Sequence, residues 1–326
     1  MRVVFVGADD NGSLTRCFAR GAGENGLDAH ALFADRLVAG WRPLFLARRF
    51  GIDAIAAVPL ARVLERRLSA IDPDLVVVVK GRFIDAACID RLRRRLRAPI
   101  VNYYPDDPLW PGHDDRRLLA ALQRYDEVVV WGERVAEGLK QRGISSRVVP
   151  FGYDPASYAP PRDRAAPRYD VVLVGQRYAA REAFVEPLAD LRLLVSGVGW
   201  DAAQADVVRR LAATRTYSAA EINRLYAQAA FGLNILSPWN LPAHNMRTFE
   251  IPATGTAMVV TRTPEHEQLF GEDGAVLVDE PAEARARILE LLADEDERRR
   301  LGERGRERVA PFTYSRRMEE LLTPWR

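Results

Sequence analysis

The sequence predicts an α/β protein made of two Rossmann-like domains, each with a doubly wound parallel sheet, that face each other across a cleft. Three observations predict this class. Short apolar runs alternate with longer helical patterns, which is typical of repeated βαβ units. The alternation stops at a proline-rich segment near the middle of the chain and then starts again. The length of 326 residues suits two domains, since one domain usually has roughly 100 to 200 residues.

The first half shows the alternation clearly. Its apolar runs are nearly continuous, as expected for strands buried on both faces of a parallel sheet. The expected strands are Val3 to Val6, Ala29 to Phe33, Leu75 to Val79, Ile100 to Tyr103 and Glu127 to Trp131. The expected helices are near Leu14 to Glu24, Leu60 to Ala70, Ile84 to Leu96, Arg116 to Gln123 and Arg134 to Gln141. We expect residues 1–155 to form the N-terminal, Rossmann-like domain.

Prolines interrupt this pattern between Pro150 and Arg168. Pro155, Pro160, Pro161 and Pro167 lack a backbone donor, so neither a helix nor a central strand runs through the segment. We therefore expect residues 156–168 to be a linker between two domains.

A second series of strands follows the linker. The expected strands are Asp170 to Val174, Leu191 to Ser196, Phe231 to Ile235, Ala257 to Thr261 and Ala275 to Val278. A charged helical region from Glu283 to Val309 and an amphipathic stretch from Tyr314 to Leu322 come next. We expect residues 169–310 to form the second domain. A terminal helix within 311–326 either packs back on the first domain or stays solvated.

Composition excludes several kinds of protein. The formal net charge of +2 does not give the broad positive field with which proteins bind nucleic acids. Cys17 and Cys88 lie far apart, without neighbours at metal-ligand spacing, which favours a reducing cytoplasm. The N-terminus opens directly into a strand, and no apolar stretch approaches the roughly 18 residues of a membrane span. We expect a cytoplasmic protein without integral membrane association.

The segment from Ser237 to Thr256 carries the strongest functional signal. It follows an expected strand with a loop and then starts a short helix, which is where open α/β sheets bind ligands. Asn245 is a good N-cap, and the helix start behind it presents backbone N–H groups to an anion. A diphosphate suits this position.

Arg247 and Glu250 are three residues apart on that helix and so share one face. The guanidinium group can neutralise a departing nucleotide diphosphate, and the carboxylate can accept hydrogen bonds from ribose hydroxyls. The alternative is a local helix ion pair, worth roughly 0.2 to 0.5 kcal/mol. Spacing alone leaves both open.

This segment resembles the donor site of a known enzyme family. Asn245-x-Arg-Thr-Phe-Glu-Ile-x-Ala-x-Gly255, followed by a strand and Glu265 to Phe270, is similar to CgeB-like (spore maturation protein type) glycosyltransferases, a GT-B family. Four other segments resemble that family in matching order, so that the resemblance covers nearly the whole chain. They are Val79 to Gly81, Asn102 to Pro108, Tyr125-Asp126 and Pro150 to Pro155.

The resemblance implies a glycosyltransferase. A sugar would pass from a nucleotide-diphosphate sugar, bound mainly by the second domain, to a small-molecule or glycan acceptor, with no metal or other cofactor. Related retaining enzymes use two Glu residues eight positions apart for sugar and ribose; Glu250 matches the second, but Pro242 stands at the first. His244 or Asn245 would take over the sugar contacts, and Thr248 is a further donor-binding candidate. The departure at Pro242 leaves the donor and the retaining or inverting outcome open.

A second candidate phosphate contact is Gly175-Gln176-Arg177, directly after the first strand of the second domain. Gly175 lets a ligand approach the backbone, and Arg177 supplies positive charge that a metal supplies in other glycosyltransferases. A turn glycine and a surface arginine explain the same residues equally well.

The acceptor-side candidates follow strands of the first domain. Asp9 and Asp10 lie after the first strand, and Asp106 and Asp107 after the fourth. Asp9, Asp106 or Asp107 would be the catalytic base, and Asp10 an acceptor contact, although such residues also form turns. Lys80, Trp110 and His113 complete the acceptor side, because the lysine ends an apolar strand and aromatic faces pack on sugars. We expect His30 and His266 to be structural.

Two other functions suit the same fold. A non-catalytic sugar-nucleotide binding protein is conceivable because the first Glu of the pair is missing. An NAD(P)-dependent oxidoreductase would use Asp35 to bind the ribose. However, Gly7 and Gly12 do not form the three-glycine fingerprint, and Asp35 lies farther along the chain than the roughly 20 residues expected for the ribose-binding acid.

Overall fold

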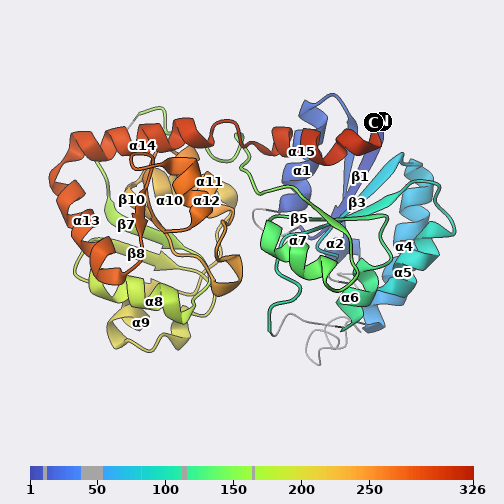
Figure 1. Ribbon diagram of the computed structural model, residues 1–326, viewed down its shortest axis with the longest axis horizontal. Helices are drawn as coiled ribbons and strands as arrows, with labels where there is room; N and C mark the ends of the chain where they lie inside the picture. Colours follow the sequence, from blue (N-terminus) through green and yellow to red (C-terminus); the bar gives the residue numbers. More distant parts are fainter. Residues whose placement is uncertain (10–12, 38–53, 82, 112–115, 164–165) are drawn as a thin grey trace. The chain divides into compact units, whose positions relative to one another are not determined.

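The chain forms two compact units in the computed structural model (Figure 1). The structure describes residues 1–326 except 10–12, 38–53, 82, 112–115 and 164–165. One unit comprises Met1–Pro150 with Tyr314–Arg326, and the other comprises Phe151–Thr313. The boundaries between the units therefore lie after residues 150 and 313, whereas the sequence predicts them after residues 155 and 310.

The N-terminal unit contains a six-stranded parallel sheet in the order β2-β1-β3-β4-β5-β6. Its central strands are mainly apolar, with Val the most frequent residue, and have almost no exposed surface, because helices cover both faces. The strands are β1 (Arg2–Gly7), β2 (Asp28–Phe33), β3 (Leu75–Val79), β4 (Ile100–Tyr104), β5 (Glu127–Val130) and β6 (Ser146–Val148).

Helices connect these strands. They are α1 (Leu14–Glu24), α2 (Ala34–Leu37), α4 (Ala54–Ile71), α5 (Ala86–Arg93), α6 (Arg116–Leu122) and α7 (Glu133–Lys140). The last helix of the chain, α15 (Tyr314–Leu322), lies beside α1 (Figure 1). Gly21 allows this approach, because a Cβ there would lie 2.7 Å from the carbonyl oxygen of Tyr314. The Asn25 side chain donates a hydrogen bond to the Ser315 carbonyl at 2.7 Å.

The C-terminal unit contains a second six-stranded parallel sheet in the order β12-β11-β10-β7-β8-β9. Its strands are β7 (Tyr169–Val174), β8 (Leu193–Ser196), β9 (Ala212–Ala213), β10 (Ala229–Asn234), β11 (Ala257–Thr261) and β12 (Val276–Val278). Its helices are α8 (Ala179–Val185), α9 (Asp206–Leu211), α10 (Ala219–Ala227), α11 (Arg247–Ala253), α12 (Pro264–Phe270), α13 (Pro281–Ala293) and α14 (Glu295–Val309).

The strand order creates one topological switch point in each sheet. In the N-terminal unit the chain runs from β1 to β2 on one side and returns to β3 on the other. In the C-terminal unit β8 and β9 lie on one side of β7, and β10 lies on the other. Ligands of open α/β sheets bind at the carboxyl ends of the strands at such points, here β1 with β3 and β7 with β10.

The expected fold class, two Rossmann-like domains with doubly wound parallel sheets, is confirmed by this topology. The ten expected strands are present with ends shifted by a few residues, and β6 and β9 were not expected. The single charged helical region is two helices, because Asp294 caps α14 by accepting a hydrogen bond from the Glu297 N–H at 2.9 Å. None of the described helices combines the length and apolar character needed to cross a membrane.

Candidate functional site

The loop after β7 packs against the loop after β8. The Gly175 N–H donates to the Ser196 carbonyl at 2.8 Å, and the Gly175 carbonyl accepts from the indole N–H of Trp200 at 2.8 Å. Gly197 has a φ of +149°, and a Cβ there would lie 2.0 Å from the Gly175 carbonyl oxygen. Glycine at 197 is therefore required for the two loops to touch.

Arg177, a predicted phosphate contact, is held by Glu182. Its Nε and Nη2 atoms both lie 2.7 Å from Glu182 Oε2. Burial alone raises the pKa of Glu182, but hydrogen bonds from the Ala205 N–H and from Arg177 bring this pKa below its usual value. Arg177 thus has a buried counter-ion at the start of α8, and its phosphate role stays a prediction.

Arg181 lies at the same switch point and was not among the predicted site residues. Its Nε donates to the Ile235 carbonyl at 2.8 Å, its Nη1 donates to the Gln176 carbonyl at 2.7 Å, and its guanidinium carbon lies 4.8 Å from the centre of the Tyr178 ring. Among the residues that the structure describes, no carboxylate lies within 4.0 Å of it. Arg181 is therefore a cation bound to neutral groups.

The electrostatic setting of Arg181 is unfavourable for its charge. Burial, together with a smaller effect of the positive charge of Arg247, lowers the pKa of Arg181 to about 10, against the opposite effects of Tyr178 and Tyr226. The group is still charged at neutral pH. A bound anion between Arg181 and Arg247 would relieve both the lost hydration and the repulsion.

Arg247 reaches the same place from α11. Its Nε donates to the Val174 carbonyl at 3.4 Å, and its Nη1 lies 3.5 Å from the Tyr158 hydroxyl. Nη1 also forms an ion pair with Glu250, whose side chain is buried. The local Arg–Glu pair considered from the sequence is therefore present, with its guanidinium at the carboxyl end of β7.

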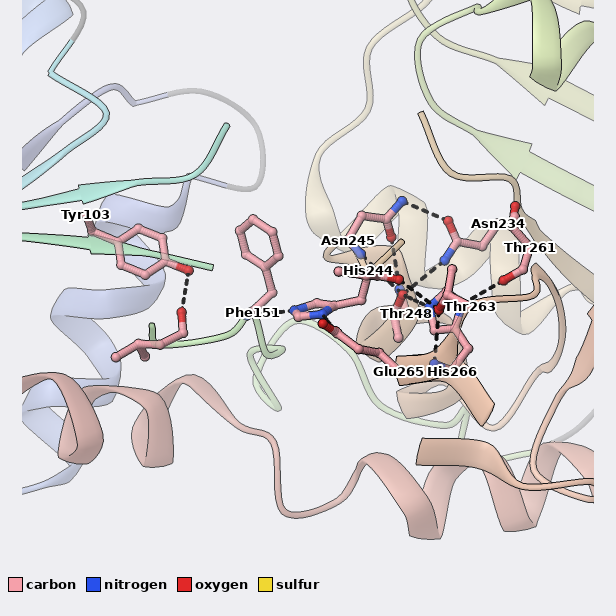
Figure 2. Close-up of polar contacts among 12 residues, drawn as sticks. Tyr103, Phe151, Asn234, His244, Asn245, Thr248, Thr261, Thr263, Glu265 and His266 are labelled. Carbon is pink, nitrogen blue, oxygen red and sulfur yellow. Dashed lines mark hydrogen bonds and ion pairs between the residues drawn. The ribbon is translucent and has the colours of Figure 1, made fainter. Parts of the chain in front are cut away.

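The start of α11 is set by a polar cluster of the buried Asn234, Thr248 and His266 with the half-buried Asn245 (Figure 2). The helix begins at Arg247 and its capping position is Met246, yet the capping hydrogen bond comes from Asn245, whose Oδ1 accepts from the Thr248 N–H at 3.2 Å. The Asn245 amide also donates to Asn234 Oδ1 at 2.9 Å. Asn245 and Thr248, predicted donor contacts, use these polar atoms inside the cluster.

His266 closes the cluster from α12. Its Nδ1 lies 2.7 Å from the Thr261 carbonyl oxygen, and its Nε2 lies 2.9 Å from Thr248 Oγ1. The ring has no exposed surface. Burial lowers the pKa of His266 to about 4, although the Thr261 carbonyl acts in the opposite direction. The imidazole is therefore neutral at physiological pH.

His244, a predicted sugar contact, lies between protein groups. Its Nε2 accepts from the Phe151 N–H at 3.3 Å, and its Nδ1 pairs with the Glu265 carboxylate (Figure 2). The rings of Phe151 and Phe249 pack edge-on against it, at centroid distances of 5.8 and 5.3 Å. Both nitrogens are thus engaged in this structure, and sugar binding by His244 stays a prediction.

In the N-terminal unit, Lys80 and Asp106 lie together. Lys80 Nζ is 2.6 Å from Asp106 Oδ2, and about a third of the Asp106 side chain is exposed. Lys80 directly follows β3, beside the switch point. Its φ of +62° is uncommon for a residue other than glycine. The structure therefore brings these two candidates together, and the Asp106 carboxylate is accessible to solvent.

The other acidic candidates have different surroundings. Asp107 is buried, pairs with Arg134 at 2.8 Å and accepts from the Leu109 N–H at 2.9 Å. The Asp9 side chain is only 4% exposed and pairs with Arg16 and Arg36. Both carboxylates hold loops together, so only Asp106 is carried into the proposed mechanism below.

The remaining acceptor-side candidates give little further geometry. Trp110 is half-buried and its N–H donates to the Asp107 carbonyl at 3.4 Å. Asp10 and His113 lie outside the described residues. Within the described part of the chain, no three His, Cys, Asp or Glu side chains gather as ligands for a metal ion.

Comparison with known proteins gives a family match and a fold. Residues 176–323, slightly less than half of the chain, match the family model "Glycosyl transferase-like". No curated protein matches the sequence. The structure resembles sucrose-phosphate synthase from Thermosynechococcus elongatus, with a TM-score of 0.69 at 15% identity over 99% of both chains.

Two further solved structures have the same fold. HepE of Anabaena, solved with UDP-glucose, gives a TM-score of 0.64 at 13% identity over 99% of this chain and 100% of that one. The α,α-trehalose 6-phosphate synthase of Burkholderia multivorans gives 0.61 at 14% identity over 99% and 96%. The chain has the GT-B fold and its residues 176–323 match a glycosyltransferase-like family model, so the enzyme class expected from the sequence, a glycosyltransferase, is confirmed.

Proposed function

We propose that this protein transfers a sugar from a nucleoside-diphosphate sugar to a hydroxyl acceptor without a divalent cation, in the manner of the CgeB-like enzymes. The observation that carries the proposal is the position of Arg181. This arginine lies at the β7–β10 switch point next to Arg247 and has backbone carbonyls instead of a carboxylate as its described partners. A diphosphate is the anion that such a position suits.

The two guanidinium groups approach the site from different helices. Arg181 comes from α8 and contacts the ends of β7 and β10, and Arg247 comes from α11 and contacts the end of β7. Together they supply the positive charge that a divalent cation supplies in other glycosyltransferases, so the reaction needs none. Glu250, fixed by its ion pair with Arg247, is the expected contact of the ribose hydroxyls.

The comparisons support a uridine nucleotide as the first donor to test. HepE, which shares the fold, was solved with UDP and with UDP-glucose. Sucrose-phosphate synthase and trehalose 6-phosphate synthase are named for products in which two sugars are joined. We therefore propose a sugar or another small hydroxyl compound as the acceptor class.

The chemistry follows from these positions. The bond between the anomeric carbon and the diphosphate oxygen breaks, and its electron pair goes to the diphosphate beside Arg181 and Arg247. The acceptor oxygen forms the new bond to the anomeric carbon and loses its proton. In an inverting reaction Asp106, oriented by the Lys80 ammonium group, takes that proton. In a retaining reaction the departing diphosphate takes it, and less is required of Asp106.

A thermal-shift panel tests the proposal. UDP, GDP, dTDP and NAD are each added with EDTA present, because a compound at about 100 times its Kd adds roughly 2.7 kcal/mol of apparent stability. We expect one nucleoside diphosphate to stabilise the protein and Arg181→Met to remove the effect. Arg300→Met, which changes an exposed arginine of α14 paired with Glu297, is the matched control.

Two outcomes would overturn the proposal: a response to NAD alone, or a response that EDTA abolishes. Release of glucose from UDP-glucose without an acceptor then separates an enzyme from a non-catalytic binding protein. We expect slow hydrolysis by the wild-type protein and much less by Arg181→Met.

A further inference from the structure

His266 is a buried polar side chain that contacts two different elements of the C-terminal unit. It belongs to α12, and its ring nitrogens meet the end of β11 at Thr261 and the first turn of α11 at Thr248 (Figure 2). The surface of the ring is fully covered. A buried imidazole is costly unless both nitrogens are satisfied, and here both are.

The direction of each hydrogen bond in the cluster follows from chemistry. The Thr261 carbonyl only accepts, so Nδ1 of His266 carries the hydrogen. In the neutral ring Nε2 then has no hydrogen and accepts from the Thr248 hydroxyl. The hydrogen of that hydroxyl is thereby fixed, and its lone pairs face the other partners.

Those partners complete a closed set. Thr248 Oγ1 accepts from the Asn234 amide at 3.3 Å and from the Asn245 N–H at 3.4 Å. Asn245 in turn donates to Asn234 and accepts from the Thr248 N–H. Each of these side chains has one orientation consistent with all the bonds, and the Nδ1–H tautomer of His266 sets the orientation of the Thr248 hydroxyl.

The first turn of α11 needs such support. The helix has seven residues and contains Pro252, so its own hydrogen bonds stabilise it little. Arg247 is its first residue, directly before Thr248. Whatever fixes the backbone at Thr248 therefore also fixes where the Arg247 side chain leaves the helix.

We propose that His266 is a positioning residue of the donor site, which acts through Thr248 to hold Arg247 against the diphosphate of the donor. The inference rests on the proposed function, since it assigns a purpose to the position of Arg247. It also replaces the expectation that His266 is merely structural. A purely structural histidine would stabilise the fold without a specific effect on the diphosphate.

Three substitutions separate these possibilities. His266→Leu removes both hydrogen bonds and keeps most of the volume. His266→Gln places an amide oxygen near the position of Nε2, where it accepts from the Thr248 hydroxyl, and serves as the conservative rescue. Thr248→Val removes the hydroxyl from the other side and keeps the shape, which provides a second route if the leucine variant does not fold. His30→Leu changes a half-exposed histidine paired with Asp28 and is the control.

Binding of UDP and of uridine, measured by calorimetry, reports on the diphosphate separately from the nucleoside. We expect His266→Leu and Thr248→Val to weaken UDP binding at least 10-fold and uridine binding less than 2-fold. His266→Gln should retain most of the UDP affinity. In an Arg247→Met background, His266→Leu should weaken UDP binding by less than a further 2-fold, because the guanidinium group that His266 positions is gone. Equal losses for UDP and uridine, an unchanged UDP affinity, or additive effects with Arg247→Met would overturn the inference.

Hydrogen exchange tests the same contact without any nucleotide. We expect the amides of Thr248, Phe249 and Glu250 to exchange at least 10-fold faster in His266→Leu than in His266→Gln, and other helices to be unaffected. Equal exchange in the two variants would overturn the inference. If the wild-type protein binds no nucleoside diphosphate while the two variants still differ in exchange, the proposed function is refuted and the hydrogen-bond cluster stands.

Discussion

Nη1 of Arg181 lies 2.7 Å from the point that a Cβ on Gly175 would occupy. Gly175, directly after β7, thus makes room for Arg181, which we assign to the diphosphate. The sequence instead predicts that a ligand approaches the Gly175 backbone directly. A methyl group there does not strain the backbone, because Gly175 has no positive φ. It meets only the end of a flexible side chain.

Gly175→Ala should therefore reduce UDP binding with little loss of stability. The methyl group displaces the Arg181 guanidinium, and a hydrogen bond to a charged group contributes about 1.5 to 3 kcal/mol, or roughly 10-fold or more in affinity. The free energy of unfolding should change by less than about 1 kcal/mol. Calorimetry with UDP and urea denaturation measure the two effects. Gly23→Ala, where the new methyl group meets nothing within 4 Å, should leave UDP affinity unchanged.

Gly197→Ala should have the opposite outcome, with a large loss of stability. Its φ of +149° disfavours any other residue, and the new methyl group would lie 2.0 Å from the carbonyl oxygen of Gly175, which is backbone and cannot move away alone. We expect a loss of about 3 kcal/mol or more in the free energy of unfolding. A variant as stable as the wild type would mean that the loops after β7 and β8 do not touch as described.

His266 should make the protein less stable in acid. Burial lowers the pKa of His266 to about 4, below the value near 6.5 of an unfolded histidine. The unfolded chain therefore binds a proton first, so the stability associated with the neutral ring is complete above pH 6.5 and is lost as the pH falls towards 4. The loss amounts to about 3 kcal/mol.

Comparison with His266→Gln isolates this effect from all other pH-dependent contributions to the free energy of unfolding. The free energy of unfolding of the wild type, relative to the variant, should fall by about 3 kcal/mol between pH 7 and pH 4. Denaturant titrations at several pH values measure it. Parallel pH profiles for the two proteins would show that the ring is accessible to protons in the folded state.

Asp106→Asn and Asp107→Asn should differ in kind. Asp106 is partly exposed and paired with Lys80, so its loss should lower turnover at least about 10-fold in an inverting enzyme and leave stability nearly unchanged. Asp107 is buried and paired with Arg134, so its loss should cost about 1 to 3 kcal/mol of stability. Transfer rates and urea denaturation of both variants provide the test. A destabilised Asp106→Asn with normal turnover would remove Asp106 from the mechanism.

The sequence was most informative where structure depends on local pattern. The valine run at β3 and the largely apolar runs of β4, β7 and β11 predicted the two parallel sheets, because strands buried on both faces are mainly apolar. The strands β6 and β9 have only three and two residues. Runs this short give no periodicity, and both lie at sheet edges, so their pairing depends on neighbours that sequence alone does not place.

The site was predicted less completely because its side chains have partners from distant parts of the chain. Arg177 and Arg181 both follow Gly175, and only the fold shows that Glu182 holds the first while carbonyls at the strand ends hold the second. A second arginine four residues after the first was the available signal. The pairing of His244 with Glu265, across 21 residues, had no local signal at all.

The most direct test is a structure of the protein crystallised with UDP in the presence of EDTA. We predict the diphosphate at the carboxyl ends of β7 and β10, with its oxygens within hydrogen-bond distance of the Arg181 and Arg247 guanidinium groups. UDP bound elsewhere, or a diphosphate that appears at this place only when a divalent cation is added, would contradict the account.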